Sequence, residues 1–159
     1  MNKSNSRTKM ILLAGFLAGT LDAIAAMIVY EVMPIPIFKF IASGAFGKAA
    51  FRGGLDMALW GFLFHYFIAY CWAILFFLLY PRIKFLSKNK VLSGLGYGIV
   101  IWIVMNRVIL PLTLVTRGAF TWKGAIIGAV ILMIMVGLPI AILAHRYYHP
   151  QGEKGRVVA

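Results

Sequence analysis

Four apolar stretches, each long enough to cross a lipid bilayer, set the solvent in which this chain folds. A helix rises about 1.5 Å per residue, so ~20 apolar residues span the ~30 Å hydrocarbon core. The stretches are residues 10–33, 55–80, 91–115 and 124–148. Inside lipid the backbone must satisfy its own hydrogen bonds, so each stretch is predicted to be a helix. The sequence predicts an all-α membrane protein with four transmembrane helices in one polytopic domain, residues 1–159.

The composition agrees with a lipid environment. Hydrophobic residues make up 62% of the chain and charged residues only 13%, against about 25% charged residues in a typical soluble domain. The net charge of +12 lies mostly between the apolar stretches, where Lys and Arg contact headgroups and set topology. No basic stripe is free of the membrane, so nucleic-acid binding is not expected. The single cysteine, Cys71, excludes an intramolecular disulfide.

The distribution of Lys and Arg predicts the orientation. With the N-terminus inside, the cytoplasmic segments carry ten basic residues: Lys3, Arg7, Lys9, Arg82, Lys84, Lys88, Lys90, Arg146, Lys154 and Arg156. The outer segments then carry five: Lys39, Lys48, Arg52, Arg117 and Lys123. We therefore expect both termini on the cytoplasmic side.

The connection between the first two stretches, residues 34–54, is too apolar for an ordinary loop. It reads PIPIFKFIASGAFGKAAFRGG and predicts a short interfacial or partly re-entrant helix on the outer side. Lys48 and Arg52 are four residues apart and share a face if the segment is helical. The segment is either a headgroup anchor, a lid over an outward cavity, or an anion-binding element that uses Gly44, Gly47, Lys48 and Arg52.

Asp22 is an ionisable residue near the middle of the first stretch. A charge at that depth costs about 2.5–3.5 kcal/mol on insertion scales, so it usually faces the bundle interior. Helical spacing places it on one face with Gly15, Gly19 and Ala26. His65 lies at a similar depth in the second stretch, so the two side chains are expected to meet. The pair is either an interhelical hydrogen bond or a protonatable pair for proton-coupled transport.

Small residues recur at four-residue spacing in three of the stretches, as Gly15/Gly19, Gly94/Gly98 and Gly124/Gly128. Such pairs let helix backbones approach closely in lipid. The second stretch lacks the motif and is rich in aromatic residues. We expect it to form a bulky wall against which the smoother helices pack. The glycine faces are also compatible with contacts between copies of the chain in a homo-oligomer.

A second polar cluster is predicted nearer the outer side. Glu31 ends the first stretch, Asp56 begins the second, and Asn106 and Arg107 lie near the end of the third. Arg107 needs compensation there, which Glu31 or Asp56 can supply. The cluster is either an ion pair that locks three helices or an outward-facing site for an anion or a lipid headgroup.

The stretches GTLDAIAAMIVYE, IASGAFGKAAFRGG and VMNRVILPL together resemble signatures of uncharacterised bacterial inner-membrane proteins, the YagU-like group. The resemblance covers about residues 15 to 147. It implies a four-helix topology in the bacterial cytoplasmic membrane, and it brings no established activity. It also implies that Asp22, Arg107 and residues 43–54 belong to one pattern.

These patterns favour a small, non-enzymatic transport, channel or lipid-binding protein with a polar interior at Asp22 and His65. The alternative is a structural or stress-related interaction protein whose polar groups only lock the helices. No nucleophile elbow, zinc motif or phosphate loop is present, so neither an enzyme nor a metal or cofactor site is expected. The expected partner is the lipid bilayer.

Overall fold

The computed structural model describes residues 3–116 and 118–149, with side chains from residue 6 onward. Every element in this part is helical. The helices are α1 (Lys3–Tyr30), α2 (Pro34–Phe46), α3 (Ala49–Arg52), α4 (Leu55–Leu79), α5 (Lys84–Lys88), α6 (Lys90–Val104), α7 (Trp122–Ile131) and α8 (Leu138–Tyr148). Four helical spans are long and apolar enough to cross a membrane: Ser6–Tyr30, Leu55–Leu79, Lys90–Leu112 and Trp122–Tyr148. The all-α fold with a shorter helix between the first two spans is confirmed, and it indicates a multi-pass membrane protein.

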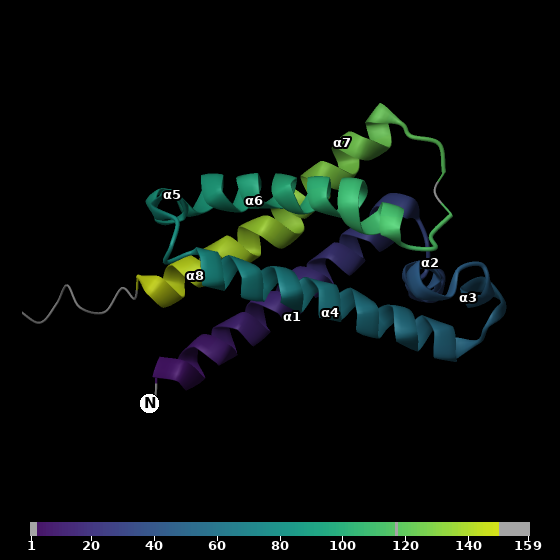
Figure 1. The fold of residues 1–159 in the computed structure, drawn as a ribbon, viewed down its shortest axis with the longest axis horizontal. Coiled ribbons are helices and arrows are strands. Elements are labelled where there is room, and N and C mark those ends of the chain that lie inside the picture. The colour runs from purple at the N-terminus through teal and green to yellow at the C-terminus, as the bar shows by residue number, and fades with distance from the viewer. Residues whose placement is uncertain (1–2, 117, 150–159) are drawn as a thin grey trace, which may run out of the picture.

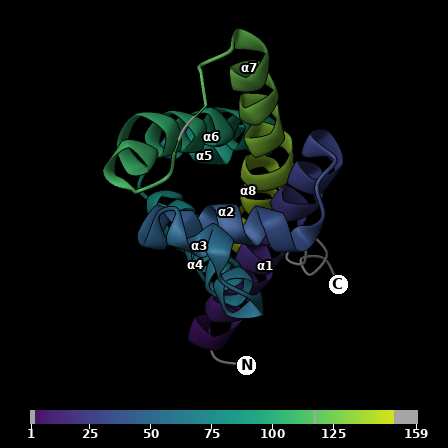
Figure 2. The ribbon, with the colours of Figure 1, turned by 90° about the vertical axis from the view of Figure 1, so that its right-hand side faces the viewer.

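The molecule has two distinct ends along its long axis. The start of α1, the end of α8 and the short helix α5 lie at one end, which we call the terminal end (Figure 1). Helices α2 and α3 and residues 113–116 and 118–121 lie at the opposite end, which we call the α2 end. Figure 2 shows α2 lying across the bundle rather than along it. The start of α1 and the end of α8 therefore lie at the same end, and Arg117, Lys154, Arg156 and the side chain of Lys3 are outside the described residues.

The first span ends at Tyr30, before the predicted boundary at residue 33. Glu31 there takes a positive φ of 52°, which breaks the helix. Pro34 and Pro36 stand in the first turn of α2, where a missing N–H removes no helical hydrogen bond. These prolines therefore begin a new helix as well as separating it from the first span.

The third and fourth spans are not continuous α-helices. The third passes from α6 into a π-helical segment, Met105–Ile109, and a 3₁₀ turn, Leu110–Leu112. The fourth contains a π-helical segment, Leu132–Gly137, between α7 and α8. Pro111 and Pro139 lie at these irregular places, as expected for a residue that cannot donate a helical hydrogen bond. The third span consequently ends at Leu112 rather than at residue 115.

The terminal half of the bundle holds a packed core. Its residues come from α1, α4, α6, the second π-helical segment and α8: Ala14, Ala18, Ala73, Phe76, Phe77, Tyr80, Tyr97, Ile101, Val136, Ile140, Ala141, Leu143 and Ala144. Small side chains on α1 and α8 meet the large ones on α4. Because of these small side chains the helices approach closely, and van der Waals packing can hold them together where lipid supplies no hydrophobic driving force.

The glycine faces are used inside the monomer. Gly15 and Gly19 pack against the rings of Tyr70 and Tyr66, so the aromatic wall predicted for α4 is confirmed for the first helix. Gly94 packs elsewhere: a Cβ added there would lie 2.7 Å from the Cα of Leu138. The third and fourth spans thus pack on each other's backbone rather than on the aromatic wall.

Candidate functional site

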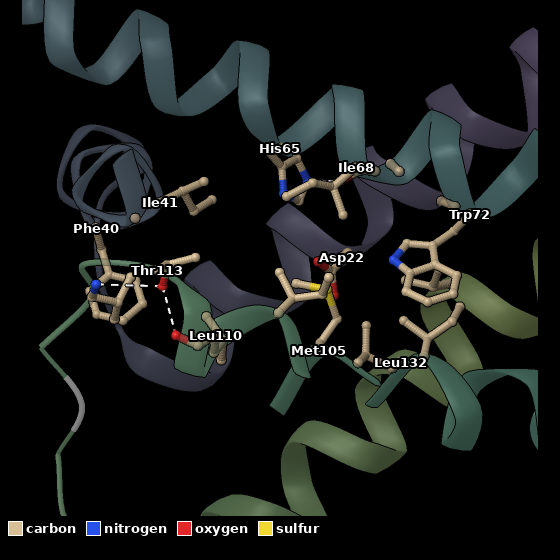
Figure 3. A pocket seen from close by; sticks show the side chains of 18 residues that line it. Asp22, Phe40, Ile41, His65, Ile68, Trp72, Met105, Leu110, Thr113 and Leu132 are labelled. Atoms are coloured by element: carbon tan, nitrogen blue, oxygen red, sulfur yellow. Dashed lines mark hydrogen bonds between the residues drawn. The ribbon is translucent and has the colours of Figure 1, made fainter. Parts of the chain in front are cut away.

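A cavity of about 230 Å³, which we call the central cavity, lies among α1, α2, α4 and the two π-helical segments. Asp22 and His65 both line it, from α1 and α4 (Figure 3). The remaining lining is mainly apolar and includes Phe40, Ile68, Trp72, Met105, Leu110, Leu132 and Val136. The expectation that Asp22 and His65 lie together in the bundle interior therefore agrees with this geometry.

His65 is oriented by the backbone of α1. Its Nε2 lies 2.8 Å from the carbonyl oxygen of Gly19. Because a carbonyl can only accept, Nε2 carries the hydrogen and donates it. In the neutral ring Nδ1 is therefore unprotonated and can take a proton. The edge of Phe38, on α2, packs against the same imidazole with ring centroids 6.1 Å apart.

Asp22 makes no hydrogen bond or salt bridge to any of the described residues. Its electrostatic partner is His65, which is close enough to interact with the carboxylate across the cavity. The direct Asp22–His65 hydrogen bond that the sequence left open is not formed. Instead, His65 bonds to the helix backbone and the carboxylate faces open space.

Asp22 also borders a second, larger space of about 650 Å³, which we call the side groove. The groove runs between α1, the end of α6 and α7, beneath residues 118–121. Tyr30, Phe40 and Trp102 supply aromatic surface, and Ala26 lies one helical turn from Asp22. The carboxylate therefore stands where an inner cavity and a more open groove meet.

Helix α2 covers the central cavity at the α2 end. Phe40, Ile41 and Gly44 line the cavity, and the N–H of Leu114 donates to the carbonyl of Gly44 at 2.9 Å. On the other side α2 crosses α4 at Gly61, where a Cβ would collide with the backbone of Phe38. These contacts match the lid alternative among the predictions for residues 34–54.

The anion-binding alternative for the same segment finds less geometric support. Gly47 has φ 58° and its N–H donates to the carbonyl of Ser43, where it ends α2. That N–H is therefore occupied by the helix cap. Lys48 and Arg52 are exposed, in positions that also suit contact with headgroups.

The predicted outer polar cluster is dispersed. Glu31, Asp56 and Arg107 are exposed, and within the described residues no ion pair joins them. Arg107 instead borders a small cavity with Trp102, Asn106 and Phe120. Arg107 lies in the π-helical segment Met105–Ile109, so its side chain does not follow the register of the regular α-helix assumed from the sequence. A lock of three helices by these charges is thus not formed in the described part of the chain.

Asn106 lies at the site in another role than the sequence predicted, and Thr20 and Tyr66 were not predicted as site residues. Asn106, expected beside Arg107, lines the side groove, and its Nδ2 donates to the carbonyl of Trp102 at 2.9 Å. Their four-residue spacing was a usable signal, because it places both on one helical face. Thr20 and Tyr66 share a hydrogen bond of 2.8 Å beside the cavity, and each directly follows a residue of the Gly19–His65 contact.

No cluster of three or more metal-ligating side chains occurs within the described residues. Comparison with known proteins gave no match among family models, curated proteins or solved structures. The resemblance to YagU-like proteins accordingly stays a prediction. The case for function rests on the geometry around Asp22.

Proposed function

We propose that this chain is a small, non-enzymatic, proton-coupled transport protein in which Asp22 and His65 hold the exchangeable proton. The observation that carries the proposal is the shared cavity: a carboxylate without a hydrogen-bond partner among the described residues and an imidazole with an available Nδ1 line the same space. Ionisable residues that face a cavity within membrane spans typically mark ion or substrate pathways.

The pair can hold one proton in two ways. A proton on His65 gives an imidazolium that the Asp22 carboxylate stabilises across the cavity, and a proton on Asp22 leaves both groups neutral. Loss of the proton leaves one carboxylate in an apolar surrounding, which must then attract another cation. Such a site favours exchange of a proton for a solute rather than a permanent ion pair.

A structural role is the second candidate, because two hydrogen bonds join α1 and α4 at this level. His65 bonds to Gly19 and Thr20 bonds to Tyr66. In this alternative the polar groups only fix the register of two helices. Stress-related interaction proteins and lipid-binding proteins would need no more than that.

The deciding experiment is an infrared titration of the purified protein in lipid vesicles. The carboxylic-acid C=O band of Asp22, identified as the band missing from Asp22→Asn, should change in intensity over the pH range of the titration as the carboxyl gains or loses its proton. His65→Gln should shift that titration. A matched Asp56→Asn variant, which changes an exposed carboxylate, should leave the Asp22 band intact.

The structural alternative makes the opposite prediction. An Asp22 band that stays in one protonation state over that range would contradict proton coupling. So would a titration that His65→Gln leaves unchanged.

We further propose that the protein lies in a bacterial cytoplasmic membrane with both termini cytoplasmic, following the excess of Lys and Arg at the terminal end. A green fluorescent protein fused to the C-terminus should fluoresce. Alkaline phosphatase inserted at Gly53–Gly54, beyond the end of α3, should be active. The reverse pattern would contradict this orientation.

A further inference from the structure

Among the described residues, the two spaces that meet at Asp22 are lined by one negative group and by no fixed positive one. The lining of the central cavity includes no Lys or Arg, and neither does the described lining of the side groove. Arg107 borders a separate cavity, and the nearest basic side chain on α2, Lys39, donates to the carbonyl of Gly53 at 2.6 Å. Within the described lining, His65 is therefore the group that can supply a counter-charge to a deprotonated Asp22.

The lining around Asp22 is unsuited to an inorganic cation. Na⁺, Mg²⁺ and Ca²⁺ need several oxygen ligands at short distance. Asp22 is the only carboxylate in the described lining of either space, and most of its neighbours are hydrocarbon or aromatic. A small ion that entered would lose its water ligands, and the described lining offers too few oxygen atoms to replace them.

The same lining suits a cation with an apolar body. Trp72 and Phe40 line the central cavity, and Trp102, Tyr30 and again Phe40 line the side groove. Aromatic faces attract ammonium-type cations, most strongly where water is excluded. The side groove, of about 650 Å³, falls within the ~300–1,000 Å³ of small-molecule sites, and the central cavity of about 230 Å³ adjoins it.

From this complementarity we infer that the Asp22 site binds organic cations, with the positive centre at the carboxylate and the aromatic or alkyl body in the side groove. The inference rests on the proposed function and names its solute class. The exchange balances in charge: one proton leaves the Asp22–His65 pair when one monovalent cation binds, and the reverse step returns it.

Among the described residues, few titratable groups share these spaces with Asp22 and can affect the competition between a proton and a cation. His65, from α4, is the titratable group that shares the central cavity, and Tyr30, from α1 itself, is the one that shares the side groove. Helix α2 and the segment Leu132–Gly137 contribute apolar side chains to both linings. Cation binding should consequently tighten as the pH rises and the Asp22 site loses its proton.

The test is equilibrium binding of radiolabelled tetraphenylphosphonium and of the smaller benzyltrimethylammonium to the full-length protein in detergent. Wild type should bind at least one of them, more tightly at higher pH, and release about one proton per cation into weak buffer. Asp22→Asn should weaken binding by at least about tenfold, a loss of roughly one charged contact. Asp56→Asn should bind as wild type does.

Two further measurements test whether binding depends on the charge of the ligand rather than on its hydrophobicity, and whether a loss of binding is caused by misfolding. Tetraphenylborate, an anion with the shape of tetraphenylphosphonium, should not bind when tested in separate samples. Asp22→Glu should keep cation binding, and Ala26→Leu, which fills the side groove beside an intact carboxylate, should reduce it. Each variant is checked by size-exclusion chromatography.

The outcomes are distinct. Failure of wild type to bind either cation, equal binding by Asp22→Asn, or equal binding of the anion would overturn the organic-cation assignment. Any of these results together with a normal infrared titration of Asp22 would leave the proposed proton coupling standing. An Asp22 carboxyl that does not titrate would contradict the proposed function itself.

Discussion

The terminal half of the bundle is filled with side chains, whereas the α2 half is hollow. In the terminal half Phe76, Phe77 and Ile140 are fully buried, among alanines of α1 and α8. In the α2 half the same helices diverge around the central cavity and the side groove. One set of helices thus forms both a solid core and a space large enough for a small molecule.

The tyrosine hydroxyls of the packed core are hydrogen-bonded, whereas the carboxylate of Asp22 has no hydrogen-bond partner among the described residues. In the terminal half the hydroxyl of Tyr97 donates to the carbonyl of Trp72 at 2.7 Å, and Tyr80 and His145 share a hydrogen bond of 2.8 Å. In the α2 half the carboxylate of Asp22 lacks a hydrogen bond to any described residue. Satisfied groups stabilise a fold, and an unsatisfied one in a cavity calls for another explanation. The contrast assigns stability to one half and the candidate site to the other.

The change occurs where two spans become π-helical. Met105 and Leu132, which each begin a π-helical segment, both line the central cavity. A π-helical turn places an extra residue in the turn and often occurs at functional sites. It shifts the register of the following side chains, so the tight packing of the terminal half cannot continue past it.

The largest effect is expected from adding a side chain at a close backbone contact between the third and fourth spans. In Gly98→Val the new Cβ would come within 2.6 Å of the carbonyl oxygen of Leu132, a backbone atom that cannot rotate away. We expect at least the ~1–3 kcal/mol cost of overpacking and a sharp loss of folded protein. Fluorescence-detected size-exclusion chromatography after heating measures it.

Gly96→Val is the matched control, because a Cβ at Gly96, on the same helix, would meet open space. Both variants change the intrinsic helix propensity in the same way, since each replaces glycine by valine. Equal thermal stability of the two variants would contradict the close packing of the third and fourth spans.

Removing a buried ring should have the next largest effect. Phe76 is 0% exposed and Phe67, on the same helix, is 68% exposed. Phe76→Ala should cost near the lower end of the ~3–5 kcal/mol found for large-to-small substitutions in water, because lipid removes the transfer contribution and leaves the cavity. Phe67→Ala should cost little. Thermal unfolding in detergent compares them, and equal losses would show that the terminal half is not the solid core.

The spans could be predicted from the sequence because their signal is local. Length and hydropathy define a membrane helix, and Pro34 and Pro81 lie at real boundaries. The depth of Asp22 and His65 followed from helical rise alone, and this brought them to one cavity. The glycine spacing likewise predicted the contact of α1 with the aromatic face of α4.

The remaining features depend on tertiary contacts. A proline marks irregularity in a helix, but neither Pro111 nor Pro139 indicates a π-helical turn rather than a kink. The dispersal of Glu31, Asp56 and Arg107 follows from that turn and from the position of α2 across the bundle. Similarly, the bond of His65 to a carbonyl instead of to Asp22 depends on sub-ångström geometry that spacing cannot supply.

A substitution in the hollow half should change stability in the opposite direction. Asp22→Asn removes a charge that lacks a hydrogen bond, so we expect no loss, and a gain well below the ~2.5–3.5 kcal/mol insertion cost of a charge. Exposed Asp56→Asn should be neutral. Thermal unfolding of both at neutral pH measures the difference. A clear loss of stability in Asp22→Asn would favour the structural alternative over proton coupling.

The smallest effect is expected at the hydrogen bond between Thr20 and Tyr66, which joins α1 to α4 beside the cavity. Membrane double-mutant cycles average about 0.6 kcal/mol for such bonds, because the unfolded helices find other partners. A cycle of Thr20→Val and Tyr66→Phe should give a coupling of that size. Tyr70→Phe is the control, since Tyr70 packs its ring on Gly15 and its hydroxyl has no described partner. A coupling above ~2 kcal/mol would mean that polar contacts, and not only the packed terminal half, hold the hollow half together.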